Sequence, residues 1–195
     1  EPLSRSYFKF LEIIVDFDLL SNRRNLDIGC LAEGPGGFIE AIVNYRKRVG
    51  IYNDMINAIT LKSSNNDIPG WTKSANFLRK NRNVRICYGK DNTGNIYNLE
   101  NIKYFSLNFR NSADLVTADG GFDFSYNFNK QEYLSCRIIF CEIVTALSIQ
   151  RKGGSFVCKF FDIYNEITKS FIYLLKSCYE NVYITKPNTS RPANS

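Results

Sequence analysis

Segments of helical and strand-like character follow one another along the whole chain. Residues 4–20 carry apolar side chains at helical spacing, and a polar break at 21–25 separates them from an apolar run at 26–32 that is typical of a buried strand. The same reasoning predicts further strands at 55–61, 84–88, 113–118, 155–161 and 182–185. It predicts further helices at 38–48, 71–79, 96–105, 131–150 and 166–177. This alternation predicts a Rossmann-like α/β fold, with a mostly parallel central sheet and helices on both faces, in one domain spanning residues 1–195.

Turn residues punctuate this pattern. The stretch 62–70 is rich in Ser and Asn and ends on Pro69-Gly70, and 89–94 is a second turn-rich loop. The pair Gly153-Gly154 is expected to cap the C-terminal end of the helix at 131–150. Ligands of such folds bind at the carboxyl ends of strands, so residues that directly follow strands are the candidates for function.

The turn after the first predicted strand is the most distinctive of these positions. It reads Ala32-Glu33-Gly34-Pro35-Gly36-Gly37-Phe38 and opens the helix at 38–48. Glycines allow a ligand to approach the backbone closely, and the first turn of a helix offers free N–H groups. The turn is not G-x-G-x-x-G and lacks the Lys-Ser/Thr pair of a phosphate loop, which disfavours a nicotinamide cofactor and a nucleoside triphosphate. Taken alone, the turn has a plain Gly/Pro loop as its alternative interpretation.

Composition narrows the class of protein. A chain of 195 residues that is 44% hydrophobic can build a full-sized core, and a net charge of +6 favours an anionic partner, with nucleic acid first. The absence of histidine excludes His-based catalysis and most transition-metal sites. No two cysteines form C-x-x-C, so we expect reduced cysteines of an intracellular protein. No apolar run approaches the roughly 20 residues that span a bilayer, and a first residue Glu1 in place of Met suggests an excised domain.

Two other strand ends carry residues with distinctive chemistry. Asp119-Gly120-Gly121 follows the strand at 113–118, and Lys159 lies at the end of the strand that begins at residue 155. An Asp and a Lys at adjacent strand ends can face each other across a ligand site. Each alone has an ordinary explanation, the Asp as a helix cap and the Lys as a solvated surface residue. Their combination with the glycine turn, in this order, favours a functional site.

With these residues the chain resembles the FtsJ-like family of S-adenosylmethionine (SAM)-dependent RNA ribose 2′-O-methyltransferases. The family's x-G-P-G-G-F turn is matched at 33–38, its S-R-x-x-x-K-L-x-E-I helix at 4–13, its A-D-G-G segment at 118–121, its K-x-F strand at 159–161 and its segment beginning S-R at 190–195. The resemblance covers nearly the whole chain and is closest to the branch that modifies mRNA caps, including versions from large DNA viruses.

The resemblance implies a Lys-Asp-Lys-Glu site. Lys9, Asp119 and Lys159 match its first three members, and the Glu would be the residue after Ser195. Lys159 is implied to deprotonate the ribose hydroxyl, with its neutral form favoured by the neighbouring Lys9 ammonium, while Asp119 orients it. The implied SAM contacts are Glu33, Gly34, Pro35, Gly36, Gly37, Phe38, Thr60, Leu61, Asp91 and Asp119. The implied RNA contacts are Ser190 and Arg191. No metal is required.

Several positions keep an alternative interpretation. The family's acidic residue shortly before the turn is missing, because Cys30 stands at its position and Asp27 lies too far away. Asp91 is either a cofactor contact or a simple turn residue. Eight basic residues form either a nucleic-acid tract or, by default, a solvated face; they are Arg46, Lys47, Arg48, Lys73, Arg79, Lys80, Arg82 and Arg85.

The expected function is methylation of the cap-proximal ribose of mRNA. The alternatives are the same chemistry on ribosomal or transfer RNA, and an inactive domain that binds RNA or scaffolds a partner. Expected partners are RNA with a capped 5′ end and, beyond it, other capping or transcription proteins; no membrane is expected. The expected location is the cytoplasm, including a virion or viral factory, with the nucleus as the alternative.

Overall fold

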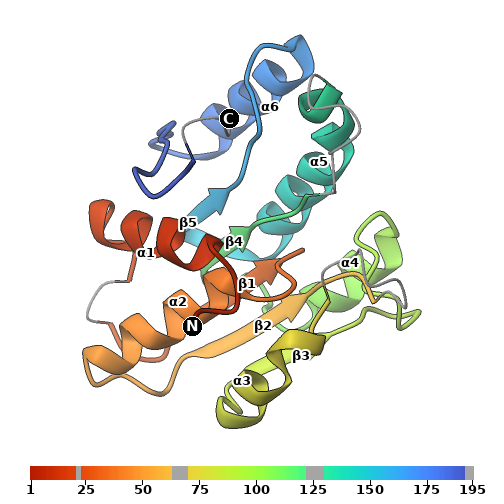
Figure 1. Cartoon of the computed structure of the whole chain (residues 1–195). Helices are drawn as coiled ribbons and strands as arrows, with labels where there is room; N and C mark the ends of the chain where they lie inside the picture. The colour runs from red at the N-terminus through yellow and green to blue at the C-terminus, as the bar shows by residue number, and fades with distance from the viewer. Residues whose placement is uncertain (21–22, 63–69, 122–129, 192–195) are drawn as a thin grey trace.

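A five-stranded parallel sheet forms the centre of the molecule (Figure 1). The computed structural model describes residues 1–20, 23–62, 70–121 and 130–191. The strand order is β3-β2-β1-β4-β5, and every neighbouring pair is parallel. The strands are β1 (Asp27–Leu31), β2 (Met55–Ile59), β3 (Val84–Cys87), β4 (Ala113–Ala118) and β5 (Gln150–Cys158). The parallel α/β architecture predicted from the sequence is confirmed.

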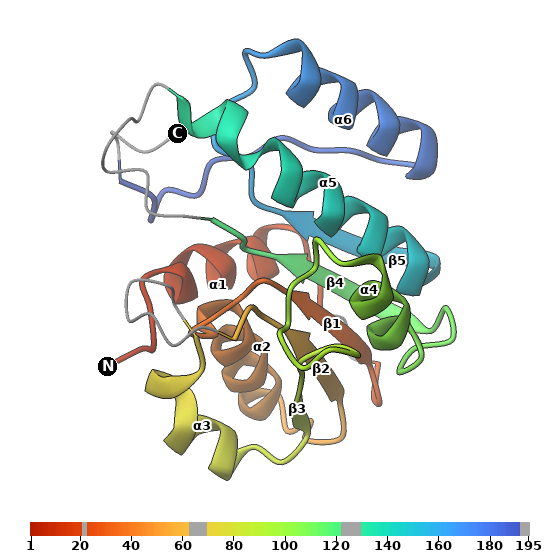
Figure 2. The same cartoon turned by 90° about the vertical axis from the view of Figure 1, so that its right-hand side faces the viewer.

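Helices cover both faces of this sheet (Figure 2). One face carries α1 (Ser6–Asp16), α2 (Gly37–Arg48) and α3 (Ala75–Lys80), the last preceded by a 3-10 turn at Thr72–Ser74. The opposite face carries α4 (Leu99–Ser106) and α5 (Gln131–Ile149). The last helix, α6 (Glu166–Cys178), packs against α5, where Phe171 stacks on Phe140. Each predicted helix is therefore present, with ends that differ by a few residues.

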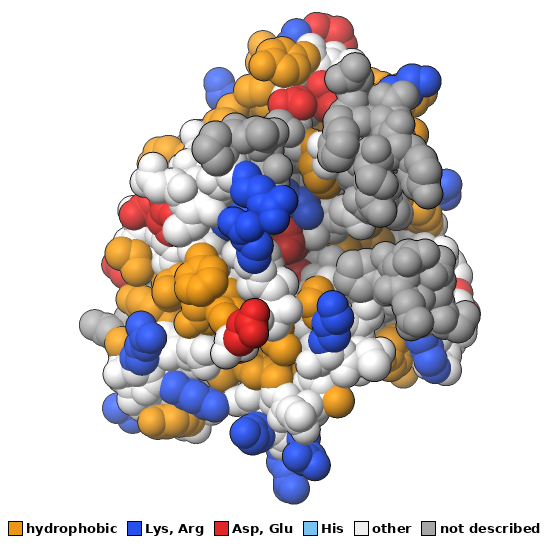
Figure 3. All heavy atoms as spheres, viewed as in Figure 1, with side chains coloured by type: hydrophobic (Ala, Val, Ile, Leu, Met, Phe, Trp, Pro, Cys, Tyr) orange, Lys and Arg blue, Asp and Glu red, His pale blue; other side chains and the backbone are white. Residues whose placement is uncertain are grey.

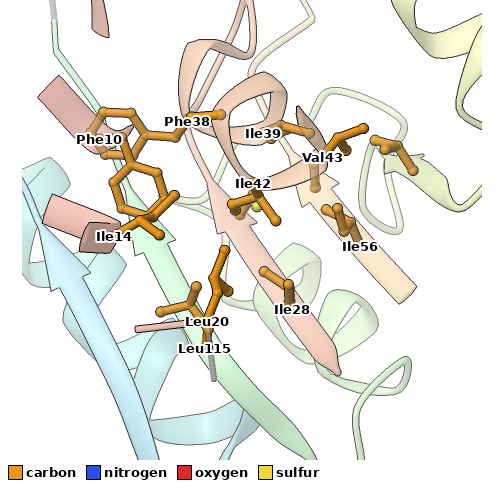
Figure 4. Packing of buried hydrophobic residues seen from close by; sticks show 14 of the residues in the cluster. Phe10, Ile14, Leu20, Ile28, Phe38, Ile39, Ile42, Val43, Ile56 and Leu115 are labelled. Atoms are coloured by element: carbon orange, nitrogen blue, oxygen red, sulfur yellow. The ribbon is translucent and has the colours of Figure 1, made fainter. Parts of the chain in front are cut away.

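The first hydrophobic core fixes α1 to α2 (Figure 4). Ile28 and Ile56 point into it from β1 and β2, because alternate residues of a strand face opposite sides of the sheet. Phe10 of α1 stacks on Phe38 of α2 with ring centroids 4.3 Å apart. Burial of two aromatic rings stabilises this contact by several kcal/mol, on the order of 2–3 for each ring. The helix that carries Lys9 is thus held against the helix that starts at the glycine turn.

The second core lies between the sheet and α5. Gly29 of β1 faces this core, and a Cβ atom added there would lie only 2.7 Å from Cδ1 of Ile149. A side chain at this strand position would therefore require the end of the Ile149 side chain to move. Phe109 closes the same core from the segment after α4.

The junction of α5 and β5 corrects one expectation. The helix ends at Ile149 and the strand begins at once at Gln150, so Gly153 and Gly154 lie inside β5 and the prediction that they cap the helix was wrong. Ala113 pairs with Gln150 and Leu115 with Ser155, so β5 carries extra residues opposite β4. Gly153 adopts a φ of 75°, a left-handed conformation that suits a bulge. Gly153 and Gly154 therefore lie at a shift of register within β5 and do not end α5.

The predicted sixth strand at 182–185 was also wrong. These residues form no strand in the described chain, and Tyr183 instead packs on Phe17 after α1. A β-prone segment becomes a strand only when another strand is available to pair with it. Of the predicted loop at 62–70, residues 63–69 lie outside the described residues. The helices within the described ranges include none that is long and apolar enough to span a bilayer.

Candidate active site

Asp119 and Lys159 lie side by side at the carboxyl ends of β4 and β5. These strands are parallel neighbours with Ala118 opposite Cys158, so the residues that follow them emerge together. The Nζ atom of Lys159 lies 3.0 Å from Oδ1 of Asp119 and donates a 2.9 Å hydrogen bond to the Asp119 carbonyl oxygen. The two side chains are 31% and 19% exposed, so a ligand can reach the pair. The predicted pairing of these two residues is present.

Lys9 joins the pair from α1. Burial lowers the pKa of its ammonium group, and the positive charges of Lys159, Arg5 and Arg191 lower it further, while the Asp119 carboxylate acts in the opposite direction. Lys9 thus lies within electrostatic range of Asp119 and Lys159, as the sequence predicts. Lys and Arg side chains gather near the middle of one face of the molecule (Figure 3). Such an excess of positive charge favours an anionic ligand.

The glycine turn lies next to this group. The Asp119 N–H donates to the carbonyl of Leu31, the last residue of β1, at 3.3 Å. Gly36 adopts a φ of 102°, a left-handed conformation that a side chain would strain, and α2 begins at Gly37. The hydroxyl of Ser74 donates to the carbonyl of Pro35, which ties the turn to the segment before α3. Phe38 contributes its ring to the core, so only its backbone can serve a ligand.

Glu33 places a buried carboxyl group between this turn and the Lys–Asp pair. It is 2% exposed, and one of its oxygens accepts a hydrogen bond from the Thr117 hydroxyl of β4. The other oxygen has no hydrogen-bond partner among the described residues. Burial raises the pKa of Glu33 well above its usual value; the Thr117 hydrogen bond opposes this shift and the charge of Asp119 adds to it. A buried acceptor without a donor is costly, so this oxygen suits a ligand that brings an N–H group.

The ends of β2 and β3 hold the other predicted ligand contacts. Thr60 accepts a 3.0 Å hydrogen bond from the Gly34 N–H and so joins the turn to β2, and Leu61 beside it is partly exposed. The Asp91 carboxylate accepts hydrogen bonds from Thr93 and from the amides of Asn98 and Asn101. The Thr93 hydrogen bonds are the main reason that the pKa of Asp91 lies well below its usual value. Within the described chain Asp91 thus organises its own loop, as a turn residue does.

Glu12 of α1 positions the predicted RNA contacts. Its two carboxylate oxygens accept hydrogen bonds from the N–H groups of Asn188 and Thr189, at 2.6 and 3.0 Å. These contacts lower the pKa of Glu12. Ser190 and Arg191 follow directly, and the charge of Arg191 reaches Lys9. The sequence analysis did not single out Glu12, although it belongs to the helix motif that carries Lys9.

The sequence analysis also missed Glu142. This residue of α5 is fully buried and accepts a 2.9 Å hydrogen bond from the Gly120 N–H, one residue beyond Asp119. Burial raises its pKa to about 8, against the opposing charge of Lys159 and the Gly120 hydrogen bond. The available signal was a glutamate four residues after Ile138, on the apolar side of a helical pattern, where a charged residue needs a partner.

The eight basic residues considered as a nucleic-acid tract include both buried and exposed side chains. Arg46 is 2% exposed and forms a two-bond ion pair with Asp54, at 2.5 and 2.7 Å, so it belongs to the core and not to a nucleic-acid tract. Lys47, Lys80 and Arg82 line a small hollow of about 170 Å³ beside this pair. A larger hollow of about 370 Å³ lies between β3 and α4, lined by Asn57, Arg85 and Tyr104 among others. Neither hollow includes the Lys–Asp pair.

Comparison with known proteins identifies what the chain is similar to. The family described as FtsJ-like methyltransferase matches residues 2–195. Among curated proteins, a cap-specific mRNA (nucleoside-2′-O-)-methyltransferase 1 of Mus musculus is 38% identical over 172 residues, which is 83% of this chain and 19% of that protein. The cap-specific mRNA (nucleoside-2′-O-)-methyltransferase 1A of Caenorhabditis briggsae is 35% identical over 168 residues, 83% of this chain and 18% of its own length. The chain thus spans about a fifth of these relatives.

A solved structure supports the fold. The crystal structure of a Plasmodium falciparum protein assigned as a ribosomal RNA methyltransferase superposes with a TM-score of 0.63. It is 20% identical and covers 95% of this chain and 92% of its own. At this identity the likeness concerns the arrangement of helices and strands alone.

Proposed function

The chain belongs to the FtsJ-like methyltransferase family, and we propose that it transfers a methyl group from SAM to a ribose 2′-hydroxyl of RNA, at the cap-proximal nucleotide of mRNA. The observation that carries the proposal is the contact between Lys159 and Asp119, with Lys9 beside them. The carboxylate and the carbonyl oxygen of Asp119 fix the position of the Lys159 nitrogen at the strand ends, where its neutral amine could take a proton from a hydroxyl group.

The residues around the glycine turn fit SAM. The unpartnered oxygen of Glu33 is a buried acceptor for the cofactor's amino group. The side of Gly37 that a Cβ atom would occupy faces the Ser4 and Ser6 hydroxyls of this chain, so the turn would serve SAM through its backbone. The hydrogen bond from the Gly34 N–H to Thr60 joins the ends of β1 and β2. Leu61, the next residue, is partly exposed beside the turn. SAM, when bound, supplies a methyl group that is already activated on a positively charged sulfur.

The task left to the protein is therefore to place and deprotonate the ribose hydroxyl. The Nζ atom of Lys159 would accept the proton of the 2′-hydroxyl as the ribose oxygen bonds to the methyl carbon and the methyl–sulfur bond breaks, leaving a neutral thioether. Asp119 holds that nitrogen in place through its carboxylate and its carbonyl oxygen. The positive charges of Lys9 and Lys159 repel each other, which contributes to the lowered pKa of Lys9.

The basic surroundings suit RNA as the acceptor. The charges of Arg5 and Arg191 act on Lys9, and Glu12 holds the segment that precedes Ser190 and Arg191. Arginine and lysine contacts to phosphates position a nucleic acid without reading its sequence. The names of the relatives favour capped mRNA over ribosomal or transfer RNA.

Methyl transfer from isotope-labelled SAM to short RNAs tests the proposal. The same transcript is offered with a 5′ cap, with a 5′ triphosphate, and as a structured ribosomal or transfer RNA fragment. We expect labelling of the capped transcript, at the 2′-oxygen of its first nucleotide. Labelling of the structured fragments alone would assign a different substrate. Absence of labelling on every RNA, with SAM binding intact, would favour an inactive binding domain.

A further inference from the structure

The buried carboxyl group of Glu142 lies behind the Lys159–Asp119 pair and takes no part in the mechanism above. Its side chain comes from the middle of α5 and is 0% exposed. Both of its carboxylate oxygens have partners, and both partners belong to the strand ends that carry the pair. Oε1 accepts from the Gly120 N–H at 2.9 Å, and the Cys158 thiol lies 3.8 Å from Oε2.

One peptide unit connects Glu142 to Lys159. The bond between Asp119 and Gly120 presents its N–H to Glu142 and its carbonyl oxygen to Nζ of Lys159, each at 2.9 Å. A peptide group that donates at one end and accepts at the other is polarised by both contacts, so each hydrogen bond strengthens the other. The orientation of this peptide plane therefore determines where the Lys159 amine is held.

Cys158 supplies a second connection. It directly precedes Lys159, and its thiol points to the same carboxyl group that holds Gly120. Burial raises the pKa of the Cys158 thiol well above its usual value, so the thiol keeps its proton and can donate it. Glu142 thus connects the end of β4, through the Gly120 N–H, to the end of β5, through the Cys158 thiol.

The packing around Gly120 leaves this arrangement little freedom. A Cβ atom added at Gly120 would lie 2.9 Å from Cδ1 of Ile138 and would overlap the Glu142 carboxylate. The glycine after Asp119 is therefore matched to a glutamate on α5. We propose that Glu142 is a positioning residue that sets the Asp119–Gly120 peptide and thereby the reactive position of the Lys159 amine, an inference that rests on the proposed methyl transfer.

The charge of Glu142 connects it to the same chemistry. The charged and titratable groups around its carboxyl group are Lys159, Asp119 and Cys158 at the strand ends and Glu33 at the turn after β1. When Glu142 is ionised, its negative charge attracts the positive charge of Lys159. When Glu142 is protonated, it holds the Gly120 N–H without that effect.

The test compares Glu142→Gln and Glu142→Leu with the wild-type protein. Single-turnover methyl transfer is measured at saturating SAM and capped RNA between pH 6.5 and 9.5, and the KM for each substrate is measured separately. Glutamine keeps an oxygen for Gly120 but never carries charge. We expect Glu142→Gln to keep its rate at pH 7 within a few-fold of the wild type. We expect the rising limb of its pH profile to move to lower pH, by about half a unit or more.

Leucine removes both connections. We expect Glu142→Leu to lower kcat by about tenfold or more, because small displacements of a reacting group cost one to two orders of magnitude. We expect KM values within about threefold of the wild type, since the effect concerns the reacting amine and not substrate binding.

Glu132→Gln is the matched control. Glu132 is also a buried glutamate of α5, but it binds the N–H of Asn165. Its substitution is expected to reduce stability and to leave the pH profile unchanged. A Glu142→Gln profile that superimposes on the wild type, or a folded Glu142→Leu with wild-type kcat, would overturn the inference. If Glu142→Leu does not fold, the Glu142→Gln profile decides. A wild-type protein without methyl transfer would refute the proposed function instead.

Discussion

The amine of Lys159 makes two contacts with one residue, a 3.0 Å ion pair with the Asp119 carboxylate and a 2.9 Å hydrogen bond to the Asp119 carbonyl oxygen. The first contact depends on the side chain and the second on the backbone. Substitution of Asp119 alone therefore removes only half of what holds the amine. Because two contacts hold the amine, the chemical role of Lys159 can be tested separately from its position.

Lys159→Ala is expected to lower methyl transfer by about 10²- to 10⁴-fold, the usual contribution of a general base. Lys159→Arg is the informative companion, because arginine keeps the charge and can pair with Asp119 but does not release its proton. Both variants should bind SAM as the wild type does, measured by calorimetry. Activity of the arginine variant within tenfold of the wild type would show that the residue positions substrate and takes no proton.

The buried pair of Arg46 and Asp54 is expected to matter for stability alone. Asp54 also accepts from the Leu26 N–H at 3.0 Å, so its loss removes both the carboxylate that faces the buried Arg46 charge and the acceptor of this N–H. Asp54→Ala should lower the free energy of unfolding by about 3–5 kcal/mol in a urea titration. The exposed Lys80→Ala in the same hollow should change it by less than about 0.5 kcal/mol. An unaltered unfolding midpoint in Asp54→Ala would contradict this assignment.

Asn101 is expected to affect SAM binding through the loop that Asp91 organises. Its buried amide donates to the Asp91 carboxylate and to the Asn95 carbonyl, at 2.8 and 3.0 Å. Asn101→Ala should lower stability by about 1–3 kcal/mol and weaken SAM binding about as much as Asp91→Ala does. The exposed Lys103→Ala on the same helix serves as the control. Much weaker SAM binding in Asp91→Ala than in Asn101→Ala would instead indicate that Asp91 contacts the cofactor directly.

The stability of the protein without SAM is expected to fall as pH rises from about 5 to 8, in part because of Glu142. The folded protein holds the Glu142 proton up to a pKa of about 8, whereas the unfolded chain loses it near the ordinary value of 4.5. The folded state therefore binds more protons across this window, and the contribution amounts to at most about 1.4 kcal/mol per pH unit.

Urea unfolding at pH 5, 6.5 and 8 measures this loss. The glutamine of Glu142→Gln cannot ionise, so the stability of this variant should fall less over the same range. Its free energy of unfolding minus that of the wild type should therefore increase with pH. A constant difference at all three pH values would mean that Glu142 titrates normally in the folded state.

The parts of the site that follow strands were predictable from the sequence. Asp119 and Lys159 could be paired because parallel strands end at one edge of the sheet, and the glycine turn could be placed because it follows the first apolar run. The joining of α5 to β5 could not be predicted, because a glycine pair signals a break in either element. The pairing of Ala113 with Gln150 is a long-range contact, and this pairing places the glycines in a bulge of β5.

The roles of residues that act through long-range contacts could also not be predicted from local sequence patterns. Glu142 stands among apolar residues of α5, and only the fold brings it to the Gly120 N–H. Asp91 has the spacing of a ligand contact, but its carboxylate is occupied by its own loop. Sequence patterns thus predicted which strand ends meet and not which neighbours hold their side chains in place.

The central claim is that a ribose 2′-hydroxyl of capped RNA accepts the methyl group. The most direct measurement offers the protein two capped RNAs that differ only in the first nucleotide, which carries either a 2′-hydroxyl or a 2′-hydrogen. Label from SAM is then located by mass spectrometry of the digested RNA. The account predicts one methyl group on the first ribose of the hydroxyl-bearing RNA and none on its deoxy counterpart. Equal labelling of the two RNAs would contradict it.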